Sequence, residues 1–393
     1  MSSLAIEGIG LLVTNDPSIG EGPLGIVRDA TLVFEGDRVA AVEGAGVVGD
    51  RHFDAGGRCV IPGFVDSHTH LVFAGDRSEE FAARMAGKPY EARGIRVTTE
   101  ATRAAGEDHL RGLTARRRAE GLRGGITHLE IKSGYGLDVT SERRLCEIAA
   151  ELTDDVTFLG AHAIPEEYEG RADDYVELVC GEMLAACAPL AGWIDVFCEE
   201  GAFDADQSRA VLDAGRSAGL GLRVHGNQLG PGPGIRLAVE MGAASVDHCT
   251  YFDDGDLEAL ANSDTVATFL PATDFSTRQP YPDGRRMIDA GAHIAIATNT
   301  NPGSSNTTSM SFCIALAVRE MGMSVDEALL AATLGGARAL RRDDVGRLAP
   351  GARADAIVLD APSYIDLVYR PGVPLVGASF VAGREIWISP PTD

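Results

Sequence analysis

Short apolar runs alternate with amphipathic stretches through the middle of the chain, from residue 61 to residue 345. The runs have the length of strands, whereas stretches such as Ser141–Leu152 and Ser324–Leu334 repeat apolar residues at the helical period. The apolar runs are Ile61–Val65, Val156–Leu159, Trp193–Val196, Leu222–Val224, Ala244–Val246, Val266–Phe269 and Ile294–Ala297. Repeated strand–helix units predict a parallel sheet, and this length of chain fits a TIM-like (β/α)8 barrel.

The two ends of the chain have a different pattern. Residues 31–34, 38–42, 355–359 and 385–388 are short β-rich segments separated by Gly, Asp and Pro, without a helical period between them. We therefore predict an α/β protein in which residues 1–60 and 346–393 together form a small β-sandwich domain and residues 61–345 form the barrel. A doubly wound sheet is the alternative, but no GxGxxG follows the first strand.

Polar residues closely follow several of the apolar runs. The C-terminal ends of barrel strands are where enzymes of this fold keep their catalytic groups, so these residues are candidates for chemistry. They are His68, His70, His162, His225, His248 and Asn299.

The sharpest local feature is the pair His68 and His70 in the segment PGFVDSHTH. Side chains at positions i and i+2 of a strand point to the same side, so both imidazoles can reach one metal ion. The pair alone is a weak signal, but the Pro-Gly turn before it and the further strand-end histidines strengthen it. This combination predicts a metal-dependent hydrolase.

The charge balance restricts the partners. The chain has 34 Lys and Arg against 58 Asp and Glu, a net charge of −24, within an ordinary globular composition that is 45% hydrophobic. A surface of this sign repels phosphate backbones, so we expect no nucleic-acid and no membrane partner. An anionic substrate would need a local cation in its pocket.

The N-terminus lacks the features of a secretory signal, and no apolar window reaches the roughly 18 residues of a membrane span. The seven cysteines are scattered without a CxxC pair, which favours reduced thiols over a disulfide framework. We expect a cytoplasmic protein.

Several longer motifs resemble those of the amidohydrolase superfamily and, within it, the imidazolonepropionases of histidine degradation, in the same order and over essentially the whole chain. They are PGFVDSHTHLVFAGDR (62–77), KSGYGL (132–137), LGAHAIPEEY (159–168), VHGNQL (224–229), VDHCTYF (246–252), TNTNPGSS (298–305) and GRLAPGARADAIVLD (346–360).

The resemblance implies a reaction and a set of site residues. The reaction is hydrolysis of 4-imidazolone-5-propanoate to N-formimidoyl-L-glutamate, with one Zn²⁺ or Fe³⁺ per subunit in what we expect to be a homodimer. A single metal also argues against a carbamylated Lys132. The implied metal ligands are His68, His70, His225 and Asn299, the catalytic residues are His248, Gln228 and Asn299, and the substrate-binding residues are Arg77, Tyr90, Tyr135, His162, Asn301, Gly303 and Ser304.

The implied roles have a physical basis. The substrate is a small molecule with a carboxylate, and the planar guanidinium of Arg77 can bind a carboxylate through two hydrogen bonds. Tyr90 and Tyr135 would supply hydroxyls and apolar walls, and His162 a hydrogen bond to the ring carbonyl or a role near the metal. Backbone N–H groups in the Pro-Gly turn around Gly303 could hold the substrate.

The chain departs from the family at two carboxylate positions. The family has Asp where this chain has Asn299, and many relatives have Glu where it has Gln228. An amide is a weaker, neutral ligand and is not a base near pH 7. Three interpretations are open: His248 serves as the base; an engineered exchange has impaired turnover; or the protein hydrolyses another small cyclic amide or amidine, or only binds a ligand.

Overall fold

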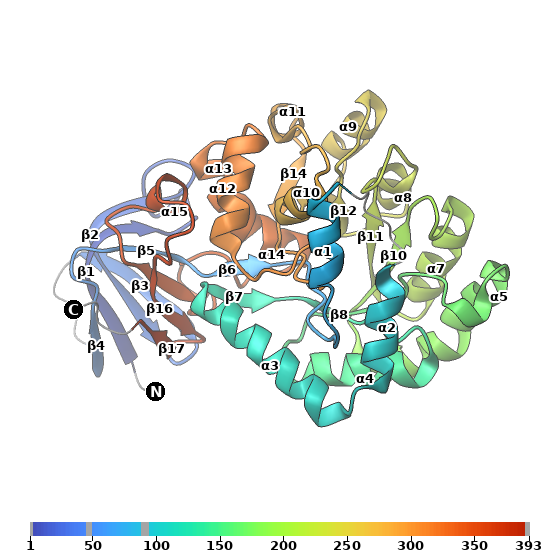
Figure 1. The fold of residues 1–393 in the computed structure, drawn as a ribbon. Helices are drawn as coiled ribbons and strands as arrows, with labels where there is room; N and C mark the ends of the chain where they lie inside the picture. The colour runs from blue at the N-terminus through green and yellow to red at the C-terminus, as the bar shows by residue number, and fades with distance from the viewer. Residues whose placement is uncertain (1–2, 45–48, 88–93, 390–393) are drawn as a thin grey trace. The chain divides into compact units, whose positions relative to one another are not determined.

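The computed structural model describes residues 3–44, 49–87 and 94–389, which group into two compact units (Figure 1). The first unit draws on Met1–Asp66, Ala119–His128 and Ser309–Asp393, and the second on Ser67–Arg118 and Leu129–Thr308. Helix α3 (Glu107–Arg123) contributes residues to both. The domain boundaries predicted after residues 60 and 345 stay a prediction.

The first unit contains an eight-stranded sheet built from both ends of the chain. Its order is β17-β16-β15-β5-β1-β2-β3, with β4 paired to β1. The strands are β1 (Ser3–Val13), β2 (Ile26–Glu35), β3 (Arg38–Gly44), β4 (Arg51–Asp54), β5 (Cys59–Pro62), β15 (Ala356–Leu359), β16 (Val376–Val381) and β17 (Arg384–Ile388). The rings of Phe34 in β2 and Phe380 in β16 lie 6.3 Å apart in one core, although their strands are not neighbours. The sheet therefore curls over on itself, as predicted for a sandwich.

Four short helices and a two-stranded sheet complete the first unit. The helices are α12 (Met310–Glu320), α13 (Val325–Leu330), α14 (Gly336–Ala339) and α15 (Asp366–Tyr369), and the strands are β6 (Phe64–Asp66) and β7 (Ile126–Leu129). Val65 in β6 is buried against Ala337, Leu340 and Val345. This packing fixes the strand that leads into His68.

The second unit is built on a parallel sheet of seven strands in the order β14-β13-β12-β11-β10-β9-β8. The strands are β8 (Ile131–Lys132), β9 (Val156–Ala161), β10 (Trp193–Cys198), β11 (Gly221–Gly226), β12 (Ser245–His248), β13 (Val266–Phe269) and β14 (His293–Ile296). Most of their residues are buried, as in a sheet covered on both faces.

The segment 67–70 closes this sheet into a barrel. On one side, the N–H of Lys132 donates to the carbonyl of Thr69 at 2.9 Å. On the other side, the N–H of Asn299 donates to His68 and that of His70 donates to Thr300, both at 3.0 Å. These bonds join the two edges of the sheet and confirm the predicted (β/α)8 class.

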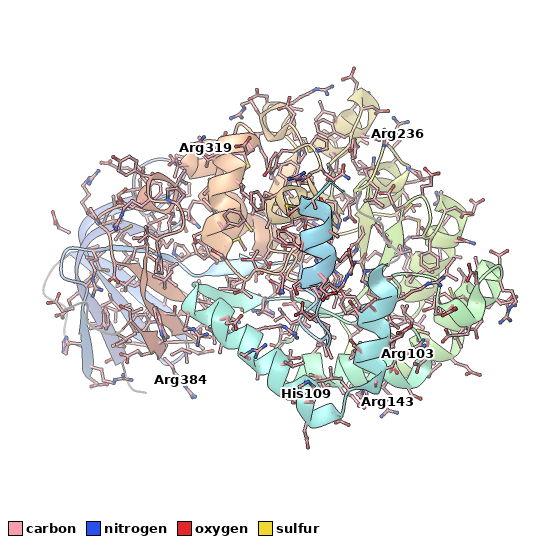
Figure 2. All side chains as sticks on the ribbon, in the orientation of Figure 1. Arg103, His109, Arg143, Arg236, Arg319 and Arg384 are labelled. Carbon is pink, nitrogen blue, oxygen red and sulfur yellow. The ribbon has the colours of Figure 1, made fainter. Side chains whose placement is uncertain are left out.

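The helices of the second unit lie outside its curled sheet (Figure 1), with α4, α7 and α8 packed on β9, β10 and β11. They are α1 (Ser78–Met85), α2 (Ile95–Ala104), α4 (Val139–Ala150), α5 (Ala172–Leu178), α6 (Leu184–Cys187), α7 (Ala205–Ser217), α8 (Gly234–Glu240), α9 (Asp254–Ala261), α10 (Pro271–Thr277) and α11 (Gly284–Asp289). Asp138 and Asp204 cap α4 and α7 by accepting backbone N–H bonds. Exposed Arg143 and Arg236 lie on the outer faces (Figure 2).

Within the described ranges, no helix has both the length and the apolar character needed to cross a membrane.

Candidate metal centre and active site

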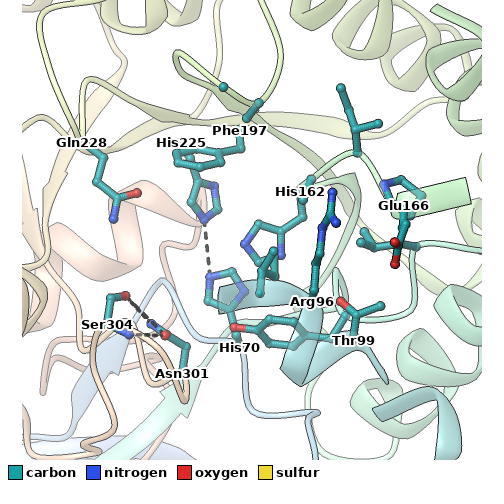
Figure 3. Close-up of a pocket in the computed structure, with 18 of the residues that line it drawn as sticks. His70, Arg96, Thr99, His162, Glu166, Phe197, His225, Gln228, Asn301 and Ser304 are labelled. Carbon is teal, nitrogen blue, oxygen red and sulfur yellow. Dashed lines mark hydrogen bonds between the residues drawn. The ribbon is translucent and has the colours of Figure 1, made fainter. Parts of the chain in front are cut away.

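Three histidines from two separate parts of the barrel form a buried cluster. His68 and His70 follow β6, and His225 lies near the end of β11. One ring nitrogen from each lies within 4.8 Å of the others. The Nε2 atom of His70 is 3.3 Å from that of His68. It is 3.4 Å from that of His225 (Figure 3).

This cluster fits a metal ion. The Nδ1 atoms of His68 and His225 face the carboxylates of Asp247, at 2.7 Å, and Asp195, at 3.0 Å. With the ring protons of His68 and His225 on Nδ1, their Nε2 atoms are unprotonated toward Nε2 of His70, and a cation between the three nitrogens would bind them. A tetrahedral ion with Zn–N bonds of 2.0–2.1 Å separates its ligands by about 3.3 Å, which matches the observed spacing.

A network of charged side chains lies behind the histidines, inside the barrel. The ammonium group of Lys132 is 2.8 Å from Glu130 and 2.8 Å from Asp195, and the guanidinium of Arg223 is 3.3 Å from Asp247. Burial opposes ionisation of Asp195 and Asp247, yet the nearby positive charges lower the pKa of both carboxyls. Lys132 is thus engaged by two buried carboxylates.

Asn299 lies beside the cluster with a left-handed backbone, φ 50°. Its amide nitrogen donates to the Thr273 hydroxyl at 2.9 Å, whereas its buried Oδ1 has no hydrogen-bond partner within the part of the chain that the structure describes. An unsatisfied buried oxygen is costly, and a bound cation would satisfy it.

His248 ends β12 and has φ 85°, an unusual backbone conformation for this residue type. Its ring centre lies 5.5 Å from that of His225 and 5.8 Å from that of His68. Burial and the neighbouring His225 lower the pKa of His248 well below the usual value, so its imidazole is neutral near pH 7 and can accept a proton.

A cavity of about 750 Å³ opens over the histidines (Figure 3). Many of the predicted site residues line this cavity, namely His70, Arg77, Tyr135, His162, His225, Gln228, His248, Asn299, Asn301 and Ser304. Gly303 packs directly against the guanidinium of Arg77. A Cβ atom at position 303 would overlap Nη1 of Arg77, so there is no room for a side chain there. Tyr90 lies outside the described residues.

His162 and Tyr135 form one wall of the cavity. The His162 ring stacks on that of His70 with centres 5.1 Å apart, and its Nδ1 is 2.8 Å from the carbonyl oxygen of Gly134. Buried Glu142 accepts N–H bonds from Gly134 and Gly136 at 2.9 and 2.6 Å, and so fixes the loop that carries Tyr135. Burial lowers the pKa of His162 to about 3.

The low pKa of His162 gives a pH-dependent stability. Between pH 6.5 and 3 the unfolded chain binds a proton at this residue that the folded chain does not, so stability falls as the pH falls. We expect His162→Gln in chelator-treated protein to reduce the slope of unfolding free energy against pH by about 1.4 kcal/mol per unit. Urea unfolding between pH 4.5 and 6 measures this slope. Exposed His109 on α3 (Figure 2) provides the control His109→Gln, and equal slopes in both variants would contradict the expectation.

Arg77, predicted to bind the substrate carboxylate, already makes two hydrogen bonds to Glu80. Its Nε and Nη2 atoms each lie 2.7 Å from a Glu80 oxygen, and Arg84 contacts the same carboxylate at 3.0 Å. Glu80 lies three residues after Arg77, in the first turn of α1. The guanidinium is thus fixed in position at the cavity wall.

The turn after Asn299 is held by its own side chain bonds. Oδ1 of Asn301 accepts the N–H group of Gly303 at 2.9 Å. It also accepts the N–H group of Ser304 at 2.8 Å (Figure 3). These N–H groups are thus engaged within the turn. Contacts of Asn301, Gly303 and Ser304 with a substrate stay a prediction.

Sequence reasoning missed the partners of the histidines. Asp195 and Asp247 are charged residues within buried strands, next to apolar runs, and this placement was the available signal. It did not indicate which histidine each carboxylate would meet, because that depends on the register of neighbouring strands.

Comparison with known proteins places these features in context. Residues 204–383 match the model of the amidohydrolase family. An imidazolonepropionase from Mycolicibacterium smegmatis is 62% identical over 389 residues, covering 98% of each chain. One from Salinispora tropica is 62% identical over 380 residues, covering 96% of this chain and 97% of that protein.

The fold is similar to that of solved hydrolases. A variant of atrazine chlorohydrolase from Arthrobacter aurescens, complexed with zinc and atraton, aligns with a TM-score of 0.73 at 20% identity. The alignment covers 97% of this chain and 94% of the other. At this identity the likeness concerns the fold.

Proposed function

The chain belongs to the imidazolonepropionase family of amidohydrolases, and on that premise we propose how its residues carry out the reaction. The protein hydrolyses 4-imidazolone-5-propanoate: water adds to the ring carbonyl carbon, the ring C–N bond breaks and N-formimidoyl-L-glutamate results. The observation that carries this conclusion is the high identity to imidazolonepropionases over nearly the whole chain.

His68, His70 and His225 would hold one metal ion, with Oδ1 of Asn299 completing the donor set. Imidazole nitrogen suits both zinc and iron, and we propose Zn²⁺ or Fe³⁺. When bound, the ion polarises the ring carbonyl and lowers the pKa of a water molecule.

The remaining residues bind the substrate and move protons. Arg77 supplies the cation for the propionate carboxylate, and Tyr135 and His162 flank the ring. His248 accepts the proton from the attacking water, because neither Asn299 nor Gln228 is a base. The proton then goes to the departing ring nitrogen.

The direct test is turnover. Purified protein incubated with 4-imidazolone-5-propanoate should produce N-formimidoyl-L-glutamate, while hydantoins and lactams should react much more slowly. Faster hydrolysis of one of those compounds would replace the substrate assignment. Tight binding of imidazolone propionate without turnover would favour an impaired enzyme or a binding protein, a second candidate supported by the two amides at positions 228 and 299.

The proposed role of Arg77 has its own test. Removing one charged partner of a hydrogen-bonded ion pair costs about 1.5–3 kcal/mol, so Arg77→Met should raise KM about 10- to 150-fold. A substrate analogue with an uncharged ethyl chain should lose little. Arg96→Met, which removes a cation farther out on the cavity wall and 40% exposed, is the control. Equal losses for both substrates would contradict carboxylate binding.

A further inference from the structure

Two of the three clustered histidines form hydrogen bonds with buried carboxylates. Asp247 is 2.7 Å from Nδ1 of His68, and Asp195 is 3.0 Å from Nδ1 of His225. All four side chains are at most 3% exposed. Each contact is a hydrogen bond that places the imidazole proton on Nδ1 and leaves Nε2 unprotonated toward the centre of the cluster.

Both carboxylates are in turn held by cations from other strands of the same sheet. Lys132 lies 2.8 Å from Asp195 and 3.9 Å from Asp247. Arg223 lies 3.3 Å from Asp247 and donates to the carbonyl of Ser67 at 2.7 Å. These partners come from β8, β10, β11 and β12, so the rigid barrel wall determines where each carboxylate sits.

We propose that Asp195 and Asp247 are positioning residues that hold His225 and His68 in the Nδ1–H form, and that they supply the metal centre with the negative charge that the amide of Asn299 does not. Lys132 and Arg223 keep the two carboxylates in place. This inference rests on the metal centre proposed above and extends it to residues that do not contact the ion.

The physical reason is the coupling across each imidazole. A carboxylate that accepts the Nδ1 proton makes Nε2 a better electron donor and fixes the ring orientation. Among the described residues, Asp247 and Asp195 are the carboxylates that form hydrogen bonds with the cluster, to His68 and His225 respectively. With a neutral residue at position 299, the contribution of these two should be larger than it would be beside a carboxylate ligand.

The test is the Zn²⁺ affinity of the whole protein, measured by competition with a chromophoric chelator. We expect Asp195→Asn and Asp247→Asn each to weaken Zn²⁺ binding about 10- to 100-fold. Asp355→Asn is the matched control, because Asp355 is a buried carboxylate paired with Arg353 in the first unit. The control should bind Zn²⁺ as the wild type does. Affinities of the two test variants equal to the control would overturn the proposal.

Repeating the two substitutions in protein that also carries Asn299→Asp tests whether the aspartates compensate for the neutral amide. The loss of affinity caused by Asp195→Asn should shrink when position 299 carries a carboxylate. An undiminished loss would overturn the claim that the two aspartates compensate for the amide.

Wild-type protein provides a measurement that needs no variant to fold. In the chelator-treated protein, ¹⁵N NMR of the histidine rings should show His68 and His225 as Nδ1–H tautomers. Nε2–H tautomers would overturn the proposal. Visible spectra of the Co²⁺-loaded aspartate variants should also differ from the wild-type spectrum, whereas a merely structural role would leave them unchanged.

Zn²⁺ binding by the wild type and by the aspartate variants distinguishes failure of the metal centre from failure of the positioning role. If the wild type does not bind Zn²⁺, the proposed metal centre is wrong and this inference falls with it. If the wild type binds Zn²⁺ and hydrolyses imidazolone propionate while both aspartate variants bind as tightly, only the positioning role is wrong.

Discussion

Removing the metal ion with dipicolinate is expected to abolish hydrolysis of imidazolone propionate. Without the ion, the histidine cluster would supply no charge to polarise the ring carbonyl, and the nearby guanidinium of Arg77 is assigned to the propionate carboxylate instead. The folded state should also lose the binding free energy, which is about 2.7 kcal/mol when the ion is present at 100 times its Kd.

The experiment compares turnover and urea unfolding before and after chelation, and then after addition of Zn²⁺ or iron separately. The ion that restores turnover at the lower concentration identifies the better fit. His70→Gln is the matched control: because it lacks one ligand, chelation should change its stability little. Full turnover by protein shown by elemental analysis to be metal-free would refute the metal centre.

Much of the barrel could be predicted because its strands are buried on both faces. Such strands consist of short runs of apolar residues in the sequence, and the run Val266–Phe269 coincides with β13. Val156–Leu159 falls within β9, which extends two residues further to Ala161. The β-rich sequence of both termini likewise predicted one shared sheet. In the structure, antiparallel pairing of β5 with β15 joins the two ends of the chain.

The candidate site was predictable residue by residue but not as a network. The motif identified His68 and His70, since position along a strand determines which way a side chain points, and the family resemblance added His225. Contacts between strands distant in sequence carry no such signal. Asp247 reaches His68 across 179 positions of the chain. Cytoplasmic location and a homodimer remain predictions for the same reason: neither follows from contacts within one chain.

The pairing of Arg77 with Glu80 shows a different limit. Residues three apart at the start of a helix are neighbours, so the ion pair was accessible from the sequence. Its importance depends on a further fact, the approach of Gly303 to the same guanidinium, which only the folded chain reveals. The guanidinium of Arg77 is therefore held from two sides.

Asn299→Asp is expected to raise the rate of imidazolone propionate hydrolysis by about 10²- to 10⁴-fold, the usual contribution of a positioned acid or base. The change replaces one amide nitrogen by oxygen and preserves the shape of the side chain. Thr273, whose hydroxyl now accepts from the amide nitrogen at 2.9 Å, can rotate its proton to donate to the carboxylate. The site would gain both an anionic ligand and a proton acceptor.

Metal content by elemental analysis and turnover should be measured for both forms side by side. Metal retention should improve as well, because a carboxylate holds a cation more firmly than an amide does. Asn301→Asp is the control: it adds the same charge to the cavity wall two residues away, but Asn301 uses its amide to donate to the Asn299 carbonyl at 2.6 Å, so turnover should not rise.

Two outcomes would change the assignment of position 299 in different ways. If the Asn form is fully metallated and as fast as the Asp form, a carboxylate at position 299 adds neither metal binding nor proton transfer, and His248 must accept the proton. If neither form hydrolyses imidazolone propionate while both bind metal, the substrate assignment fails but the metal centre stands. A rise in rate without a change in metal content would assign the gain to proton transfer, because the ligand role would then be already satisfied by Oδ1 of the amide.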